Sequence, residues 1–219
     1  MLNWDQIETV LLDMDGTLLD LYFDNYFWQE HVPLRYAQKN QLTVAEAKNT
    51  LFPVFRNKEG TMDWYCLDYW SETLALDIAE LKREVEHLIA IHPYVIEFLD
   101  KLKQLNKTVA LVTNAHHKSL MLKMDRTALH HHLEHIICAH DFGLPKEDPD
   151  FWDKLKDRLP FNNTTTLLID DSLPVLRSAK RFGIGFLRAV YHPDSKNPRR
   201  DVAEFEAIED FLQIMPPAS

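Results

Sequence analysis

Val10-Leu11-Leu12-Asp13-Met14-Asp15-Gly16-Thr17 decides the fold of this chain, because it joins a short apolar run to two aspartates and a turn. The apolar run is typical of a buried strand in a parallel sheet. Gly16 reaches backbone conformations that cost other residues free energy, so the chain can turn sharply there. Open α/β sheets bind ligands outside the carboxyl ends of their strands. We therefore expect Asp13 and Asp15 to lie at a ligand site.

The composition of the chain indicates which kinds of molecule it can bind. The chain has 219 residues, 46% of them hydrophobic, which suits one domain with a sizeable insertion or two small domains. Its 34 acidic residues against 24 basic ones give a formal net charge of -10. Such a balance argues against a nucleic-acid partner, which would favour a basic face. An anionic small molecule would need local cations or a metal ion at its site.

The sequence predicts a cytoplasmic protein without a membrane partner. Cys66 and Cys138 lie in different segments, so we expect no disulfide framework and a reducing compartment. The first residues lack the basic and apolar regions of a signal peptide. No apolar run is long enough to span a bilayer.

Alternating strand and helix patterns surround a long helical segment. Residues 21–90 are rich in aromatic and helix-compatible residues, with helix-start signals at Thr43-Glu46 and at Asp77, and predict a helical insertion. Residues 1–20 and 91–219 predict an α/β core whose parallel sheet is covered on both faces. The other expected strands are 109–112, 136–138, 166–169 and 184–187, and the expected core helices are 95–102, 118–129, 149–159, 175–182 and 208–214.

Polar residues follow three more of the expected strands. Thr113 ends one, Lys146 lies in the loop after another, and Asp170-Asp171 ends a third. These strand ends share one edge of a parallel sheet, so we expect them to converge with the first two aspartates. Carboxylate oxygens suit Mg²⁺, which offsets the repulsion between an attacking carboxylate and a phosphate dianion. A lysine and a threonine hydroxyl stabilise a transferring phosphoryl group. The set predicts phosphate-ester chemistry with Mg²⁺.

This order of residues resembles the four motifs of the haloacid dehalogenase-like (HAD) phosphohydrolases. The four motifs are Asp13-Met14-Asp15-Gly16-Thr17, Thr113-Asn114, Lys146 and Asp170-Asp171. The resemblance implies a Rossmann-like core, with residues 21–90 as a C1-type helical cap. It also implies that Asp13 is a nucleophile that forms an aspartyl-phosphate, and that Asp15 is the general acid and base.

The same resemblance implies the remaining roles at the phosphate and metal sites. Thr113 and Lys146 are expected to complete the catalytic set, and Asn114 joins them in binding the phosphoryl group. For Mg²⁺ the expected ligands are Asp13, the backbone carbonyl of Asp15, and one or both aspartates of the fourth motif.

The fourth motif departs from the commonest pattern of the family. Val175 stands where many relatives carry another acidic residue, four positions after the metal aspartate. We therefore expect Asp171 to bind the metal directly and Asp170 to be a partial ligand or to support the ligands from behind.

The insertion carries the expectation about substrate. Its stretches Asp20–Trp28 and Trp64–Trp70 resemble the cap of bacterial GMP/IMP 5′-nucleotidases of this superfamily. That resemblance implies a purine nucleoside 5′-monophosphate as the small-molecule partner. Most aromatic side chains there are expected to pack a core, and a few to stack on the base. Asp24, Asn25 and Asp68 are the polar candidates to contact the ribose or a base edge.

Several alternatives remain open. A sugar-phosphate phosphatase or a phosphomutase of the same fold would share the core and differ only in the cap. A haloacid dehalogenase needs no metal and therefore not this acidic cluster, and a response-regulator receiver is shorter and places its acidic pair before the phosphorylated aspartate. A non-catalytic binding module on this scaffold would be expected to lose Asp13, Asp15 or Lys146, and all three are present.

The histidine-rich segment predicts a solvated face rather than a zinc site. The histidines follow no known zinc spacing, and the hard ion Mg²⁺ prefers oxygen ligands. The members of the group are His116, His117, His130, His131, His132, His135 and His140.

Overall fold

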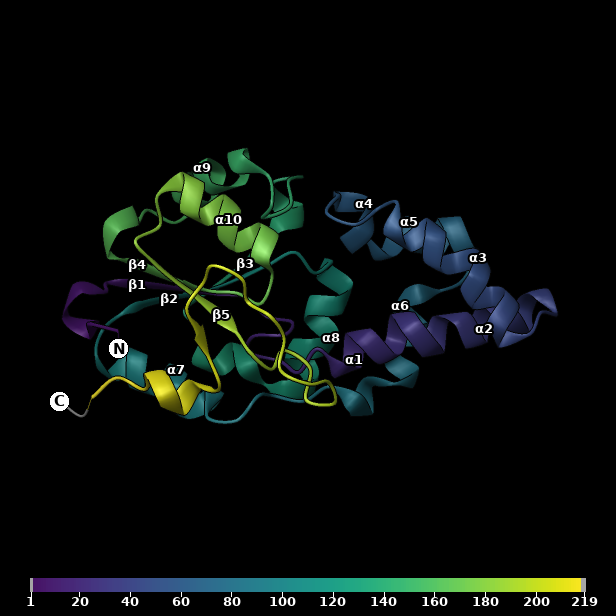
Figure 1. The fold of residues 1–219 in the computed structure, drawn as a ribbon, viewed down its shortest axis with the longest axis horizontal. Helices are drawn as coiled ribbons and strands as arrows, with labels where there is room; N and C mark the ends of the chain where they lie inside the picture. The colour runs from purple at the N-terminus through teal and green to yellow at the C-terminus, as the bar shows by residue number, and fades with distance from the viewer. Residues whose placement is uncertain (1, 218–219) are drawn as a thin grey trace.

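The computed structural model describes residues 2–217, and it consists of a helix-covered sheet with a helical arm extending from one side (Figure 1). The strands are β1 (Thr9–Leu12), β2 (Thr108–Thr113), β3 (His135–Cys138), β4 (Thr166–Ile169), β5 (Phe186–Val190) and β6 (Ala207–Ile208). The helices of the arm are α1 (Tyr22–Tyr26), α2 (Val32–Asn40), α3 (Val44–Arg56), α4 (Met62–Tyr65), α5 (Leu67–Leu74) and α6 (Ile78–Glu84). The helices around the sheet are α7 (Val95–Gln104), α8 (His117–Thr127), α9 (Pro149–Arg158) and α10 (Leu173–Phe182).

All neighbouring strands of the sheet are parallel, in the order β3-β2-β1-β4-β5-β6. In this register Val10 lies beside Val109 on one side and beside Leu167 on the other. The order reverses at β1, and open α/β sheets of this Rossmann-like kind bind ligands at such a switch point. Because Asp13 directly follows β1, the first motif stands at the place where the fold favours a ligand.

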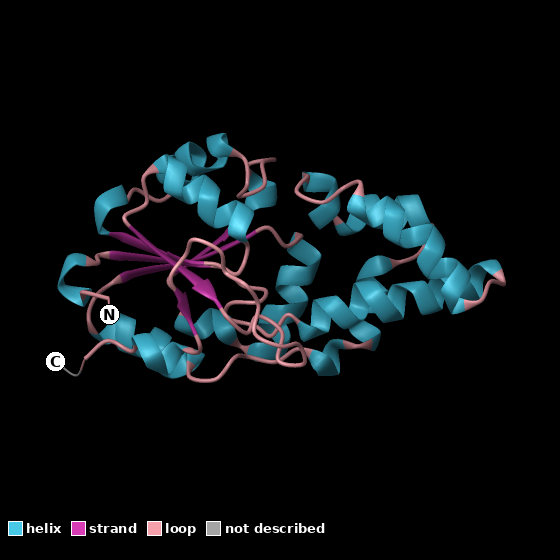
Figure 2. Cartoon of the chain, viewed as in Figure 1, coloured by secondary structure: helices cyan, strands magenta, loops and turns pink. Residues whose placement is uncertain are grey.

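Helices cover both faces of the sheet, as Figure 2 shows, and both faces are apolar. Successive strand residues point to opposite faces. Leu11 therefore belongs to the cluster on one face, with Phe151 and Trp152 of α9. Leu12 belongs to the cluster on the other face, which contains Phe98 of α7. This two-sided burial explains the near-continuous apolar runs of the strands, and each fully buried large side chain stabilises the fold by about 1.5–3 kcal/mol.

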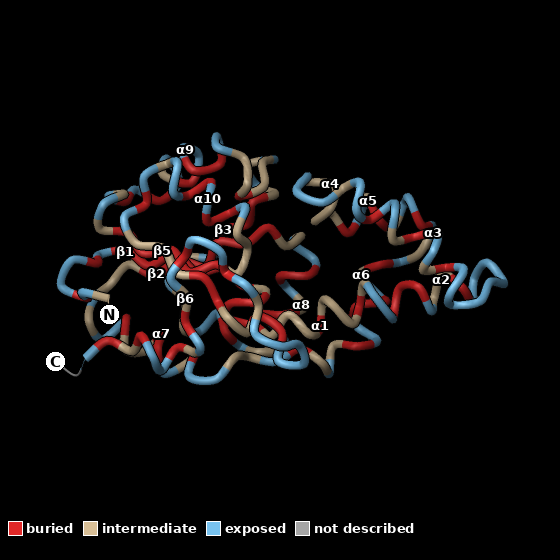
Figure 3. The backbone as a smooth tube through the Cα atoms, viewed as in Figure 1, coloured by how far each residue is buried: buried red, intermediate tan, exposed pale blue. Residues whose placement is uncertain are grey.

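The helical arm begins with one nearly continuous helix from α1 through α2. A π-helical turn at Phe27–His31 joins the two. The predicted capping box at Thr43 and Glu46 is confirmed, because each residue caps the backbone of the other at the start of α3. Asp77 accepts the N–H of Glu80 and caps α6 as predicted. The buried stripe of the arm, red in Figure 3, contains the aromatic residues that pack between its helices.

Two predictions near the C-terminus are wrong in their bounds. The strand expected at 184–187 is β5 at Phe186–Val190, because Gly185 instead donates its N–H to Asn163 and packs so tightly on Thr164 that a Cβ would lie 2.5 Å from a carbonyl oxygen. The helix expected at 208–214 begins as β6, whose Ile208 pairs with Val190 of β5. Only Phe211–Ile214 forms a helical turn, of the 3-10 kind. Within residues 2–217, the helices lack the length and apolar character that crossing a membrane requires.

Candidate active site

Lys146 is the centre of a buried group of charges at the carboxyl edge of the sheet. Its Nζ lies 2.5 Å from Oδ1 of Asp13, 2.7 Å from Oδ2 of Asp170 and 3.0 Å from the carbonyl oxygen of Val112. All three charged side chains are buried. Their mutual attraction raises the pKa of Lys146 above its ordinary value against the opposing effect of burial, so the ammonium stays charged. The residues expected from the first, third and fourth motifs therefore meet in space.

The residues of the second motif hold this lysine in place. Asn114 accepts the backbone N–H of Lys146 on its side-chain oxygen at 2.9 Å and donates its amide to Glu147 at 2.9 Å. Thr113 ends β2, and its hydroxyl oxygen accepts the N–H of Ala115 at 3.0 Å, which leaves the hydroxyl proton free to donate. Both side chains line the same cavity as Lys146, where a phosphoryl group can receive hydrogen bonds.

Three carboxylates form a site that fits a hard divalent cation. Asp13, Asp170 and Asp171 each place an oxygen within 4.8 Å of the others. Burial raises the pKa of all three carboxyls, to about 6 for Asp13, and the nearby charges of Lys146 and Arg200 offset this effect only in part. Oxygen ligands are those that Mg²⁺ prefers, and one or two of these carboxylates suffice for it together with water or phosphate oxygens.

The two aspartates of the fourth motif are used differently. Asp170 binds Lys146 with one oxygen and accepts the N–H of Ser172 with the other at 2.8 Å. Asp171 accepts a hydrogen bond from Arg200 at 3.1 Å on Oδ2. Gly16, in the left-handed region at φ 88°, packs against Asp171 so closely that a Cβ there would lie 2.8 Å from its carboxyl carbon. A side chain at position 16 would therefore displace Asp171, the carboxylate with more freedom to bind a cation.

Asp15 belongs to a second charge network, with two buried lysines and two half-buried aspartates, which joins the sheet to the helical arm. Nζ of Lys123 lies 2.6 Å from both Asp15 and Asp24, and Nζ of Lys82 lies 2.6 Å from the other oxygen of Asp24. Burial raises the pKa of Asp15 to about 6, whereas the two lysines outweigh burial at Asp24 and lower its pKa to about 2. Asp24 therefore stays ionised, while Asp15 can exchange a proton near neutral pH.

Sequence reasoning missed these two lysines, although a signal for them exists. Lys123 lies on the buried face of α8 beside Leu120 and Met124, and Lys82 lies on the buried face of α6 beside Leu81. A lysine at a buried position of an amphipathic helix requires a partner charge, because burying it alone costs several kcal/mol. Arg200 was missed for another reason: its segment has the composition of a polar loop, and only the fold brings it to Asp171.

The charged residues at the edge of the sheet line one side of a cavity of about 590 Å³, which we call its floor. The floor of the cavity is Asp13, Asp15, Thr113, Asn114, Lys146, Asp170 and Asp171. The roof comes from the helical arm and consists of Trp28, Phe52, Phe55, Trp64 and Tyr65. Asn25 and Arg56 also line the cavity from the arm.

The rings of the roof pack on one another, and Tyr65 of the roof contacts the core next to the floor. Trp28 and Trp64 stack at 6.4 Å between ring centroids, and Phe55 packs edge-on against both rings. Tyr65 donates its hydroxyl to Glu147 at 2.6 Å, and Glu147 in turn accepts from Asn114. The cavity is therefore enclosed between an ionic and an aromatic wall.

Asp24 and Asp68, two residues of the insertion that were expected to contact the substrate, lie in different places relative to the cavity. Asp24 lines the cavity, although both of its oxygens are bound by lysines. Asp68 lies outside the cavity lining, with its side chain 55% exposed, and pairs with Lys118. The prediction that Asp68 contacts the substrate therefore gains no support from its position in the first turn of α5.

The expectation of a solvated histidine face is wrong for two members of the group. His117, His130 and His131 are exposed. In contrast, the side chain of His116 is only 12% exposed, and Nε2 of His140 is buried without a hydrogen-bond partner among the described residues. Packing of the helical arm against the segments after β2 and β3 covers these two rings.

Comparisons with known proteins agree with this geometry. A family model described as haloacid dehalogenase-like hydrolase matches residues 7–183. The GMP/IMP nucleotidase YrfG of Escherichia coli (strain K12) is 40% identical over 97% of this chain and 96% of its own length. A phosphorylated carbohydrates phosphatase of Thermotoga maritima is 24% identical over 95% of this chain and 98% of its own length.

Solved structures share the fold. The HAD phosphatase from Thermococcus onnurineus superimposes with a TM-score of 0.79 at 20% identity, over 95% of this chain and 96% of that one. A putative beta-phosphoglucomutase from Thermotoga maritima gives a TM-score of 0.65 at 20% identity, over 95% and 97%. With the family match over most of its length and a relative at 40% identity, the chain belongs to the haloacid dehalogenase-like hydrolase family.

Proposed function

We propose that the protein is a Mg²⁺-dependent phosphomonoesterase that hydrolyses purine nucleoside 5′-monophosphates, with GMP and IMP as its preferred substrates. The observation that carries the proposal is the cavity between an ionic floor and an aromatic roof. The floor has the groups that phosphoryl transfer needs, and the roof offers rings on which a flat base can stack. The 40% identity to a relative named GMP/IMP nucleotidase supports the choice of base.

In this proposal Asp13 attacks the phosphorus atom. The bond from phosphorus to the ester oxygen breaks, an aspartyl-phosphate forms, and Asp15 gives its proton to the departing nucleoside oxygen. Water then attacks the aspartyl-phosphate while Asp15 takes up a proton from it, which releases phosphate and restores both carboxyl groups. The pKa of Asp15 near 6 suits a group that must act as acid and then as base.

Lys146 and the second motif orient the phosphoryl group. The ammonium of Lys146 already lies against Asp13 and supplies positive charge where the phosphoryl oxygens would sit. Thr113 can donate its hydroxyl proton, and Asn114 keeps the lysine segment in position. Asp13, the backbone carbonyl of Asp15 and Asp171 would hold Mg²⁺, with Asp170 behind them. When bound, Mg²⁺ neutralises carboxylate repulsion and polarises the phosphoryl group.

Residues 21–90 act in this proposal as a cap on a core of residues 1–20 and 91–219. The support is the set of contacts that cross between the two parts at the cavity, from Tyr65 to Glu147 and from Asp24 to Lys123. Opening of the cap would admit the nucleotide, and closure would exclude water. The unpaired Cys66 and Cys138 are compatible with a cytoplasmic site of action.

The test is phosphate release with Mg²⁺ from a panel of GMP, IMP, AMP, UMP, ribose 5-phosphate and p-nitrophenyl phosphate. We expect kcat/KM for GMP and IMP to exceed that for ribose 5-phosphate by about tenfold or more, as one stacked base contributes roughly 1–3 kcal/mol. Equal values for ribose 5-phosphate would instead support a sugar-phosphate phosphatase, the second candidate, which the Thermotoga maritima relative favours. Absence of hydrolysis across the panel would leave a binding module.

A further inference from the structure

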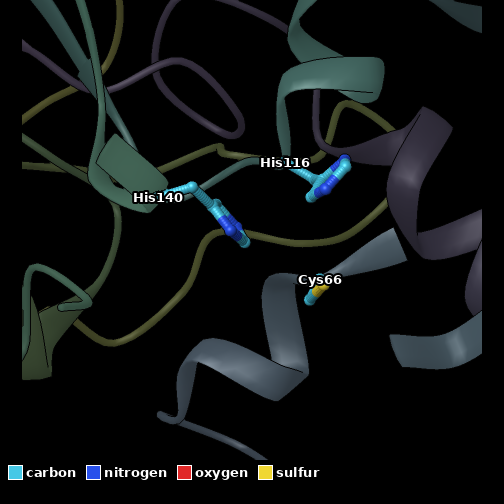
Figure 4. Close-up of side chains that lie close together, drawn as sticks. All are labelled: Cys66, His116 and His140. Atoms are coloured by element: carbon cyan, nitrogen blue, oxygen red, sulfur yellow. The ribbon is translucent and has the colours of Figure 1, made fainter. Parts of the chain in front are cut away.

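A second group of possible metal ligands lies between the helical arm and the sheet, apart from the carboxylates of the floor. Figure 4 shows Cys66, His116 and His140 turned toward a common point. One ligand atom from each residue lies within 4.8 Å of the other two. Cys66 lies between α4 and α5, His116 precedes α8, and His140 follows β3. The three residues thus come from three separate segments.

The chemistry of these side chains favours a borderline or soft cation over Mg²⁺. Thiolate and imidazole ligands select Zn²⁺ and similar ions, whereas Mg²⁺ requires oxygen. Tetrahedral Zn²⁺ with sulfur at about 2.3 Å and nitrogen at about 2.0–2.1 Å needs ligand atoms roughly 3.5 Å apart. Closing the present spacing takes about 1 Å of side-chain movement. The structure assigns this cluster, we propose, as a Zn²⁺ site that ties the helical arm to the core.

His140 provides the independent observation that favours a ligand at this cluster. Its Nε2 is buried and has no hydrogen-bond partner among the described residues. A buried polar atom in this state costs free energy that a bound ion would recover. A histidine nitrogen in this state, next to a second histidine and a cysteine, is placed to ligate a cation.

The other two proposed ligands, His116 and Cys66, would lose few hydrogen bonds on binding a cation. His116 accepts the N–H of Lys118 on Nδ1 over 3.3 Å, and ligation through Nδ1 breaks only this long hydrogen bond. The carboxylate of Asp68 lies 3.6 Å from Nε2 of His116, where it can orient the ring, as carboxylates commonly do for histidine ligands. Cys66 accepts the N–H of Tyr69 at 3.4 Å and can keep this contact as a thiolate.

The position of the site predicts a structural consequence. Tyr65 and Leu67, the two neighbours of Cys66 in sequence, line the cavity, and so does His116. A cation bound by Cys66 together with both histidines would hold this part of the roof against the core. The proposal concerns binding and does not depend on the identity of the phosphate ester.

The test is a Co²⁺ titration of chelator-treated full-length protein, followed by visible and near-ultraviolet absorption, with excess Mg²⁺ present to occupy the carboxylates. We expect about one equivalent to give the thiolate-to-cobalt charge-transfer band and the strong visible bands of four-coordinate cobalt, and Zn²⁺ to bleach both. Absence of a charge-transfer band would overturn the proposal.

Substitutions identify the ligands. C66S should abolish the charge-transfer band, and serine can still cap α5, so the fold is retained. H140Q should weaken Zn²⁺ binding by at least about tenfold. C138A and H117Q are matched controls, a buried cysteine and an exposed neighbouring histidine, and should behave like the unsubstituted protein. A band that persists in C66S or disappears in C138A contradicts the assignment.

Hydrogen exchange tests whether Zn²⁺ at this site holds the helical arm to the core. Zn²⁺ should slow amide exchange of residues 62–74 in the unsubstituted protein and leave it unchanged in C66S. Unchanged exchange in the unsubstituted protein with Zn²⁺ bound would refute the tie. Circular dichroism of each variant without metal checks that the fold is intact.

Discussion

The floor and the roof of the cavity are built by different physical means. The floor consists of polar and charged groups at the carboxyl ends of parallel strands and of Lys146 from a loop, which binds Asp13 and Asp170 by buried hydrogen bonds. The roof consists of rings that hold each other by edge and face contacts within a helical arm. In the proposed function, the chemistry would depend on groups held at the edge of the sheet, and substrate selectivity would depend on the packing of the rings of the roof.

The largest expected effect comes from a substitution in the floor, at the proposed nucleophile Asp13. Asp13→Asn removes the attacking carboxylate, and we expect kcat to fall by about 10³-fold or more for every substrate, large or small. The measurement is steady-state turnover of GMP and of p-nitrophenyl phosphate, with mass spectrometry to exclude deamidation and circular dichroism to confirm the fold. Near-native turnover by the folded variant would remove Asp13 from the role of nucleophile.

The metal ligands of the floor give the next largest effect. Asp171→Asn should raise the Mg²⁺ concentration for half-maximal activity by about 10–100-fold, and Asp170→Asn should raise it less, because Asp170 already binds Lys146 and Ser172. The two variants change adjacent aspartates in the same way, so each is the control for the other. The reverse order would exchange their roles, and full activity in a strong chelator would show that no metal takes part.

A roof substitution should separate two substrates that the floor treats alike. Trp64→Leu removes a cavity-lining ring but keeps the backbone carbonyl that accepts from Trp70. We expect the KM for GMP to rise about tenfold, from the loss of roughly 1–3 kcal/mol of stacking, with little change for p-nitrophenyl phosphate. Tyr36→Leu, in the arm but outside the cavity lining, is the matched control. Equal losses for both substrates would mean that the roof supports the floor and does not select the base.

The smallest expected effect concerns stability and pH. Asp13 and Asp15 have folded-state pKa values of about 6, above the ordinary value of about 3.9 for an unfolded chain. Their contribution to stability is therefore fully present below about pH 4 and is lost as the pH rises through about 6. Without metal, we expect Tm to fall by several degrees between about pH 5 and about pH 7.

Two additions check the source of this dependence. Excess Mg²⁺ should flatten the decrease, because it stabilises the ionised carboxylates in the folded state. Asp13→Asn should reduce the slope, since one of the carboxyl groups with a raised pKa is gone. A Tm in chelator that stays constant or rises over this range would show that ionisation of the two buried aspartates does not destabilise the fold.

The sequence by itself determined the strands and the groups that follow them. An apolar run that ends on Asp13, Thr113 or Asp170 specifies both a buried parallel strand and a polar residue at its carboxyl end, so the floor could be predicted residue by residue. The capping signals at Thr43 and Asp77 were equally local, and each helix begins where its cap predicts. Local patterns suffice for these features because the period of a strand and the hydrogen bonds of a cap involve only a few neighbouring residues.

Only the tertiary structure decided which distant side chains share a partner. Lys123 reaches Asp15 across 108 residues, and Cys66 meets His140 across the seam between the arm and the core. Asp68 has the same local setting as the roof residues, yet it lies outside the cavity lining and pairs with Lys118. The physical reason is that a buried charge, a buried imidazole nitrogen and a stacked ring each need a partner, and the chain folding in three dimensions supplies that partner from positions that no local spacing specifies.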